Sequence, residues 1–283
     1  MNGLVSTPFV VKVSRRWKRW ERHMTVSKRQ LFVIITVILT IVLVLTQLVS
    51  GEFRYPMVAL LSLAAYFLSA FGLREDLKGI EWMSLLILPT LFTTATALFY
   101  FLLPVRWLTR LPVAALYAVG MYALLLTENI YNVAAIRTIA LLRAAHSVGF
   151  VLTLVTYFLL TQTLLAFRLW AFPNMLLVGV LGGVFAFQSL WAMELESQVS
   201  KRVYLFSLVV AVIQMELAWV LSFWPIRTTL LALFYTTTYY GITGLAQQYL
   251  TERLYKRTII EFMSVMAIVF LIVLFTARWR DPI

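Results

Sequence analysis

Long apolar runs separated by short polar turns constrain this chain more than any other feature. Nine such runs, each about 20 residues long, follow residue 30; they lie near 31–49, 56–72, 82–103, 112–128, 148–167, 174–193, 203–223, 228–250 and 259–277. A helix of about 20 apolar residues crosses the hydrocarbon core of a bilayer. The pattern therefore predicts an all-α integral membrane protein with about nine transmembrane helices.

Composition excludes several classes of protein. Of the 283 residues, 62% are hydrophobic and 13% are charged, which is too apolar for the surface of a soluble domain. The chain has no cysteine, so disulfides, thiolate metal sites and cysteine nucleophiles are excluded. The net charge of +12 is interpreted as a match to an anionic membrane surface, with no role in binding nucleic acid.

The first 30 residues form a segment of their own. Trp17 and Trp20 lie on the apolar stripe of a predicted amphipathic helix, and basic residues cover the rest; these are Arg15, Arg16, Lys18, Arg19 and Arg22. Such a helix is typical of segments that lie on anionic lipid, although a solvated tail that only sets the topology is the alternative. Ser27 and Gln30 have the spacing of a capping box before the first span.

The distribution of basic residues predicts the orientation. With the N-terminus inside, seventeen of the 24 Lys and Arg residues fall on the cytoplasmic side and seven on the outer side. This bias favours an N-in, C-out protein of the plasma membrane, because basic residues concentrate in cytoplasmic loops.

Similar turns predict a duplication. FRYPM, with Pro56, resembles FRLWAFPNM, with Pro173, and Pro104 corresponds to Pro225 in the same way. Spans 1–4 (31–128) would then repeat as parallel copies in the second half (148–277), with the ninth span extra. The alternative is that prolines at span ends match by chance.

Residues 129–147 link the two halves and are predicted to form an interfacial helix. Polar residues in and beside it make a candidate headgroup or anion site, namely Glu128, Asn129, Asn132, Arg137, Arg143 and His146. Arginine and amide groups at a membrane face suit a phosphate, and Glu128 is the expected partner of Arg137. The alternative is interfacial anchoring and helix capping.

Glu216 is the one acidic residue well inside a predicted span, and it is expected to face the bundle or a wet cavity. Gln214, Gln162 and Thr96 complete a candidate intramembrane polar site. The site would carry a proton or a substrate; the alternative is a neutral carboxyl hydrogen-bonded between helices. The remaining glutamines, including Gln188 and Gln247, are assigned to interhelical hydrogen bonds.

No catalytic set is visible. The only aspartates, Asp76 and Asp281, lie outside the spans, and the zinc-protease, nucleophile-elbow and phosphate-loop motifs are absent, so neither a metal nor a cofactor is predicted. The sequence favours a transporter or lipid-handling protein. The alternatives are a structural or partner-binding subunit and a membrane-embedded transferase without a recognisable motif. The expected partners are anionic lipid and a membrane protein or a second copy of the chain.

Overall fold

A computed structural model describes residues 27–46, 53–74, 81–103, 107–134, 141–195 and 198–277. Within these ranges the chain forms nine helices, which are α2 (Lys28–Thr46), α3 (Arg54–Leu73), α4 (Glu81–Tyr100), α5 (Trp107–Ala134), α6 (Leu142–Ala166), α7 (Ala171–Glu194), α8 (Lys201–Leu221), α9 (Thr228–Leu250) and α10 (Lys256–Thr276). Each helix overlaps one predicted apolar run, so the all-helical fold is confirmed. The predicted front helix, with Trp17, Trp20 and its basic residues, lies outside the described residues.

Seven of the nine helices are long and apolar enough to cross a membrane. The described apolar stretch of α4 is shorter, at Ser84–Tyr100. Helix α9 falls outside the set of seven because threonines and glutamines interrupt its apolar residues. This agrees with the expectation of a membrane protein, while the number of spans and their orientation stay predictions.

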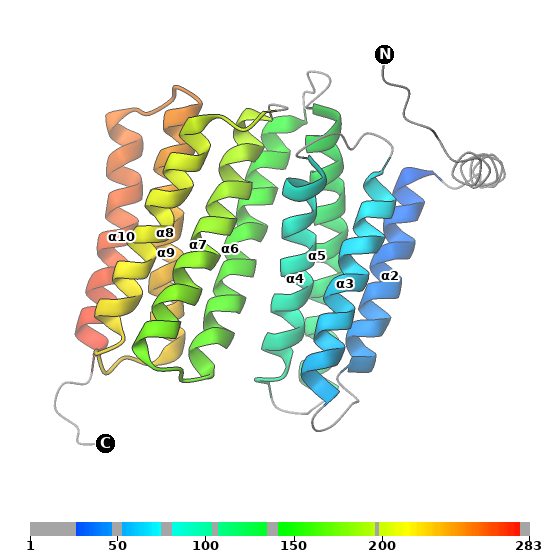
Figure 1. Ribbon diagram of the computed structural model, residues 1–283, viewed down its shortest axis with the longest axis horizontal. Helices are drawn as coiled ribbons and strands as arrows, with labels where there is room; N and C mark the ends of the chain where they lie inside the picture. Colours follow the sequence, from blue (N-terminus) through cyan, green and yellow to red (C-terminus); the bar gives the residue numbers. More distant parts are fainter. Residues whose placement is uncertain are drawn as a thin grey trace, which may run out of the picture.

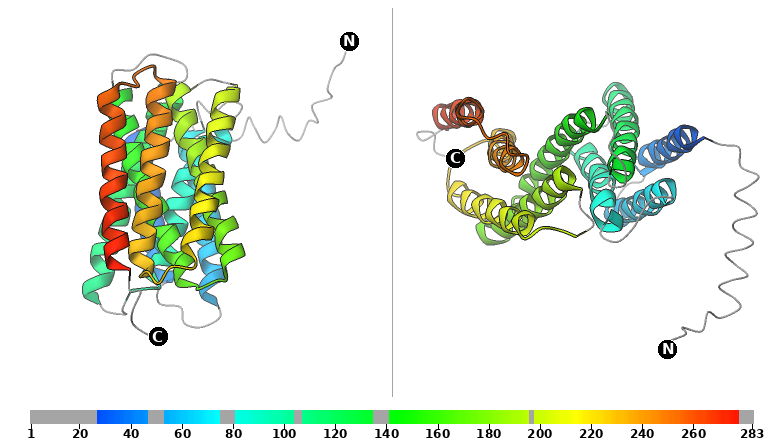
Figure 2. Two further views of the ribbon diagram at one scale, coloured as in Figure 1. Left: turned by 90° about the vertical axis from the view of Figure 1, so that its left-hand side faces the viewer. Right: turned by 90° about the horizontal axis from the view of Figure 1, so that it is seen from above.

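Two groups of four helices make up most of the structure (Figures 1 and 2). In the first group α2 packs against α3, α3 against α4, α4 against α5, and α5 returns to α2. The second group has the same neighbours, α6 with α7, α7 with α8, α8 with α9, and α9 with α6. Contacts of α6 with α4 and α5 join the groups, and α10 packs on α9.

Local signals fix several helix ends. The predicted capping box opens α2, where the Ser27 N–H donates to Gln30 Oε1 at 2.9 Å and the Gln30 N–H donates to Ser27 Oγ at 3.4 Å. Ser200 caps α8, because its Oγ accepts a hydrogen bond from the Val203 N–H. Both contacts satisfy N–H groups that a helix start leaves without partners.

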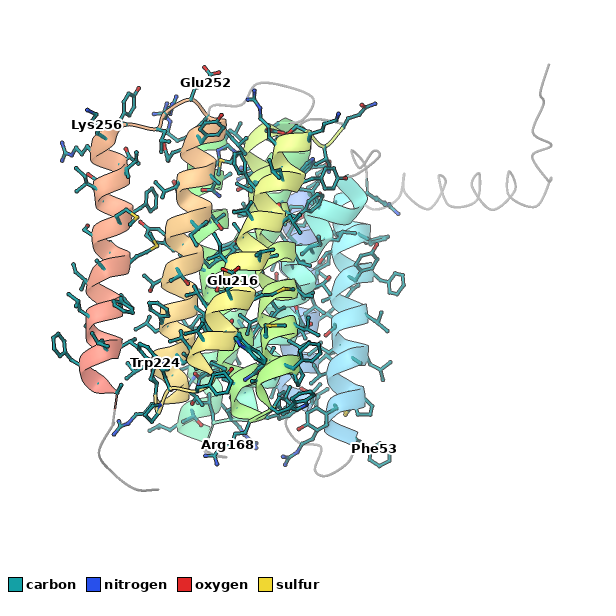
Figure 3. All side chains as sticks on the ribbon, turned by 60° about the vertical axis from the view of Figure 1, so that its left-hand side comes forward. Phe53, Arg168, Glu216, Trp224, Glu252 and Lys256 are labelled. Atoms are coloured by element: carbon teal, nitrogen blue, oxygen red, sulfur yellow. The ribbon has the colours of Figure 1, made fainter. Side chains whose placement is uncertain are left out.

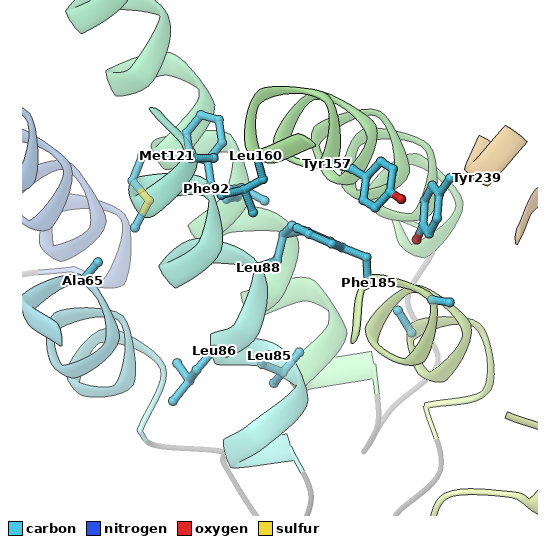
Figure 4. Close-up of a cluster of buried hydrophobic side chains, with 14 of the residues drawn as sticks. Ala65, Leu85, Leu86, Leu88, Phe92, Met121, Tyr157, Leu160, Phe185 and Tyr239 are labelled. Atoms are coloured by element: carbon cyan, nitrogen blue, oxygen red, sulfur yellow. The ribbon is translucent and has the colours of Figure 1, made fainter. Parts of the chain in front are cut away.

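Buried aromatic side chains pack between helices α6, α7 and α9 of the second group (Figure 4). Tyr157 of α6 stacks on Tyr239 of α9 with ring centroids 4.6 Å apart, and it meets Phe185 of α7 edge-on at 5.7 Å. All three side chains are fully buried. Because side-chain packing is a main source of helix association in lipid, this cluster is a principal joint between α6, α7 and α9.

Helices α7 and α8 approach each other closely at glycines. A Cβ atom at Gly183 would lie 3.0 Å from Ala211 Cβ, and one at Gly179 would lie 3.1 Å from the Ala211 carbonyl oxygen. Gly179 and Gly183 are four residues apart on one face of α7, the spacing that lets two membrane helices approach. Side chains at these positions would force α7 and α8 apart.

One end of the molecule carries most of the described basic residues. Helices α6, α8 and α10 begin there, with Arg143, Lys201, Arg202 and Lys256 in their first turns. Figure 3 shows Glu252 and Lys256 at this end, with Phe53, Arg168 and Trp224 at the opposite end. We call the end with Lys256 the basic end.

Candidate functional site

Glu216 does not face the bundle. Its side chain is exposed on α8 (Figure 3), on the same outward face as the exposed Val212 and Trp219. Gln214 takes the inward direction, because residues two apart on a helix point about 200° from each other. The expectation that the Glu216 carboxyl lies against the bundle or in a cavity is therefore wrong.

The other predicted intramembrane residues contact separate parts of the structure. Gln214 is buried and donates from Nε2 to the Tyr235 carbonyl oxygen at 3.1 Å. Gln162 donates to Thr229 Oγ1 at 3.3 Å, and the Thr96 hydroxyl donates to the carbonyl of Phe92 in its own helix. No hydrogen bond among the described residues joins these groups to one another or to Glu216, so the structure does not bring them into one site.

The predicted interfacial helix is divided between two helix ends. Asn129 and Asn132 belong to the last turns of α5, whereas Arg143 and His146 belong to the first turns of α6. Their projection onto one helix is therefore wrong, because α5 continues to Ala134 and a new helix begins at Leu142. Arg137 lies outside the described residues, so its pairing with Glu128 stays a prediction.

The last two turns of α5 form a hub of buried polar contacts. Glu128 and Asn132 are fully buried. Glu128 Oε1 accepts a hydrogen bond from Gln188 Nε2 of α7 at 3.4 Å, and Asn132 Nδ2 donates to the Leu73 carbonyl oxygen of α3 at 3.0 Å. These bonds connect α5 with α3 in one helix group and with α7 in the other. They confirm the interhelical role predicted for Gln188.

His146 lies where α5, α6 and α7 meet. Its Nε2 is 2.9 Å from the Ala192 carbonyl oxygen at the end of α7. Its ring is tilted against the Tyr131 ring, with centroids 5.5 Å apart, and the Tyr131 hydroxyl donates to the Ala145 carbonyl oxygen. The histidine is thus held by both neighbouring helices at the basic end.

A pocket of about 320 Å³ opens beside His146, between α6, α9 and α10; it is lined by Arg143, His146, Ser147, Phe150, Met193, Tyr240, Gln247, Gln248, Thr251, Arg253 and Phe262. Arg143 and Arg253 are both exposed at its rim. Stacked and tilted rings form one wall, with Tyr240 between Phe150 at 5.9 Å and Phe262 at 5.0 Å. The pocket is basic at its outer edge and aromatic inside.

A small cavity of about 10 Å³ lies next to this pocket. Four residues line both spaces, namely His146, Phe150, Met193 and Gln247. The cavity also touches Gln188 and Ser189, and Gln247 Nε2 donates to Ser189 Oγ at 2.7 Å. Polar side chains therefore lie between the open pocket and Gln188, the partner of Glu128, beside a space the size of about one water molecule.

Sequence reasoning found part of this site. It singled out Arg143, His146 and Glu128, but treated Arg253 only as a charge that sets orientation. Arg253 lies 110 residues after Arg143 in the chain, and their proximity depends on α9 returning to the start of α6. Across the described ranges there is no group of three or more His, Cys, Asp and Glu side chains that could hold a metal ion.

Comparison with known proteins places the chain in a family. No curated protein matches it, and no solved structure does. A family model described as "Protein of unknown function (DUF5656)" matches residues 69–276, which is more than half of the chain. The match runs from the last turn of α3 to the end of α10, and so contains the pocket and the hub around Glu128. The chain belongs to the DUF5656 family of proteins of unknown function.

Proposed function

We propose that this protein handles lipids, and that it binds the phosphate-bearing headgroup of an anionic lipid in the pocket between α6, α9 and α10. The observation that carries the proposal is the polarity of that pocket. Arg143 and Arg253 stand at its rim, while Phe150, Tyr240 and Phe262 line its interior. A phosphate prefers guanidinium donors, and apolar parts of the same lipid prefer the aromatic wall.

The position of the pocket along the helices supports the same assignment. Arg253 follows the end of α9, whereas Tyr240 lies about three helical turns inside it. One turn advances 5.4 Å along the axis, so Tyr240 lies roughly 15 Å deeper than the end of α9. An anionic lipid is arranged in the same way, with a charged headgroup at the membrane surface and apolar chains that run inward.

The buried side of α9 supports transport of the bound lipid as the activity. Its buried side includes Thr238, Tyr239, Thr243 and Gln247, with polar groups over several turns. Polar side chains in a bundle interior bond neighbouring helices, as Gln247 does with Ser189 of α7, and can also line a substrate pathway. A dry, uniformly apolar interior would favour a purely structural subunit.

The proposal places the protein in the plasma membrane with nine spans and its N-terminus inside. The basic end then faces the cytoplasm, as the positive-inside rule requires. The matching neighbour pairs of the two helix groups support a parallel repeat of α2–α5 in α6–α9, with α10 added. Pro56 and Pro173, the prolines paired in the sequence, are each the third residue of their helix.

Cysteine labelling in intact cells tests this orientation. Pro225→Cys and Tyr255→Cys introduce thiols at exposed positions on the outer and the basic end, in a chain that has no cysteine of its own. We expect a membrane-impermeant maleimide to label Pro225→Cys in intact cells, and Tyr255→Cys only after permeabilisation. Labelling of Tyr255→Cys from outside would contradict the orientation and with it the cytoplasmic position of the pocket.

Lipid retention by a double arginine variant tests the headgroup site. Hydrogen bonds to charged groups contribute about 1.5–3 kcal/mol each, so Arg143→Ala with Arg253→Ala should weaken binding of phosphatidylglycerol at least about tenfold. The measurement is the amount of spin-labelled phosphatidylglycerol bound to the detergent-solubilised protein, with phosphatidylcholine as the neutral probe. Inorganic phosphate is added as a competitor, which separates a free-phosphate site from a lipid site.

The control removes two charges from the same end without touching the pocket. Lys201→Ala with Arg202→Ala lies in the first turn of α8, and these residues do not line the pocket. We expect this pair to bind phosphatidylglycerol as the unmodified chain does, within about twofold, because exposed charges away from the ligand are screened. Equal losses in both double variants would show only a general electrostatic effect and would overturn the proposed site.

A further inference from the structure

We infer that the hub in the last two turns of α5 is a sodium-ion site centred on the Glu128 carboxylate. This site is distinct from the lipid pocket, lies deeper in the structure, and does not depend on the proposed function. It is built by residues from both helix groups, namely Glu128 and Asn132 of α5 and Gln188 of α7.

The carboxyl group of Glu128 lacks a neutralising partner among the described residues. The side chain is 0% exposed, and the hydrogen bond it makes among the described residues is the contact of Oε1 with the Gln188 amide, at 3.4 Å. Oε2 is buried and has no hydrogen-bond donor in the part of the chain that the structure describes. An ionised carboxylate buried without compensation costs several kcal/mol, so this carboxyl group is either protonated or paired with a positive charge close to Oε2.

The atoms around Glu128 favour a metal cation over a hydrogen-bond donor. Gln188 Oε1 and Asn132 Oδ1 are also buried and also lack donors. Glu128 and Asn132 are four residues apart on α5 and therefore neighbours on one face. A single proton on Glu128 would supply one donor for several acceptors, whereas a hard cation is coordinated by several oxygens at once.

The amide nitrogens of Asn132 and Gln188 already donate hydrogen bonds, and the amide oxygens of the same side chains remain available. Asn132 Nδ2 donates to the Leu73 carbonyl oxygen at 3.0 Å, and Gln188 Nε2 donates to Glu128. These bonds fix which end of each amide faces its partner. One carboxylate oxygen and two amide oxygens are left, with one formal negative charge, and this set suits a monovalent cation better than Ca²⁺ or Mg²⁺.

The small cavity lies beside the hub. It touches Gln188, and it shares the lining residues His146 and Gln247 with the open pocket. A sodium ion from the basic end would pass these residues after losing most of its water shell. Because the hub joins α3, α5 and α7, the ion would stabilise the contact between the two helix groups.

Thermal unfolding of the full-length protein in nanodiscs, monitored by tryptophan fluorescence, tests the proposal. The unmodified protein is measured in NaCl and in choline chloride at equal ionic strength, and binding of radioactive ²²Na⁺ is measured in parallel. We expect saturable ²²Na⁺ binding and a higher Tm in NaCl, because a ligand that binds only the folded state stabilises it. Glu128→Gln should retain the fold and lose both effects.

A second variant keeps the test decisive if Glu128→Gln does not fold. Gln188→Met is similar in size and removes one ligand oxygen, and it should reduce the affinity for ²²Na⁺ at least about tenfold. The control is Glu216→Gln, which alters an exposed carboxyl on the outer face of α8 and should leave sodium binding unchanged.

Three results would overturn the sodium site. The first is an unmodified protein that binds no ²²Na⁺ and has the same Tm in both salts. The second is stability that depends on pH but not on sodium and loses this dependence in Glu128→Gln, which would assign a proton to the carboxyl group. The third is sodium-independent stability that is lost in Arg137→Ala, which would assign the neutralising charge to that arginine. None of these results bears on phosphatidylglycerol binding, so the two proposals fail separately.

Discussion

Replacing Tyr157 with alanine is expected to destabilise the folded protein by about 3–5 kcal/mol, the range for truncating a large aromatic residue in a packed core. The ring is fully buried and contacts Tyr239 of α9 and Phe185 of α7. Its loss would leave a cavity where three helices meet. In a membrane the main loss is van der Waals packing, because lipid already surrounds the helices with apolar groups.

Tyr157→Phe is the matched control, since it keeps the ring and both ring contacts. The measurement is the free energy of unfolding in mixed micelles, obtained by titration with a denaturing detergent. We expect Tyr157→Phe to stay within about 1.5 kcal/mol of the unmodified chain. A loss in Tyr157→Ala no larger than in Tyr157→Phe would contradict the role of the ring stack.

Replacing Gly179 and Gly183 together with leucine is expected to separate α7 from α8 and to reduce the yield of folded protein severely. A Cβ at Gly183 would already lie 3.0 Å from Ala211 Cβ, and a Cβ at Gly179 would meet Met215 and the Ala211 carbonyl. Overpacking costs about 1–3 kcal/mol at each site. The backbone carbonyl cannot move aside as a flexible side chain can, so the helices themselves must shift.

Val180→Leu is the control on the same turn of α7, because Val180 is 54% exposed and points away from α8. Size-exclusion chromatography and thermal unfolding of the purified proteins compare the variants. We expect Val180→Leu to match the unmodified protein, within about 0.5 kcal/mol. Normal yield and Tm in the double leucine variant would show that α7 and α8 do not depend on this close approach.

The helices themselves could be predicted from the sequence, because crossing a bilayer imposes length and hydrophobicity on each segment separately. The capping box of Ser27 and Gln30 is equally local, and the structure contains both of its hydrogen bonds. Interhelical bonding by Gln188 and Gln247 also followed from residue type, since a buried amide in an apolar bundle must find a partner.

The arrangement of the candidate site could not be predicted in the same way. The depth of Glu216 in its span is a local property, but the direction of its side chain depends on where α7 and α9 pack. Likewise, Asn132 and Arg143 were assigned to one helix because the apolar pattern does not show that α5 extends to Ala134. Arg143, Arg253 and Phe262 meet only through contacts between α6, α9 and α10, and such contacts leave no periodic signal in a single sequence.

The contact between α9 and α10 allows substitutions outside the pocket lining to change the width of the pocket. Helix α10 has one buried residue, Val273, and supplies Phe262 to the pocket wall. Gly244 of α9 lies directly against the Phe262 ring, and Gly241 lies against Met266. Substituting either glycine would displace a weakly held wall while leaving both rim arginines in place. Under the proposed function, changes at these two glycines would alter the width of the ligand that the pocket accepts, without altering the arginines proposed to recognise its charge.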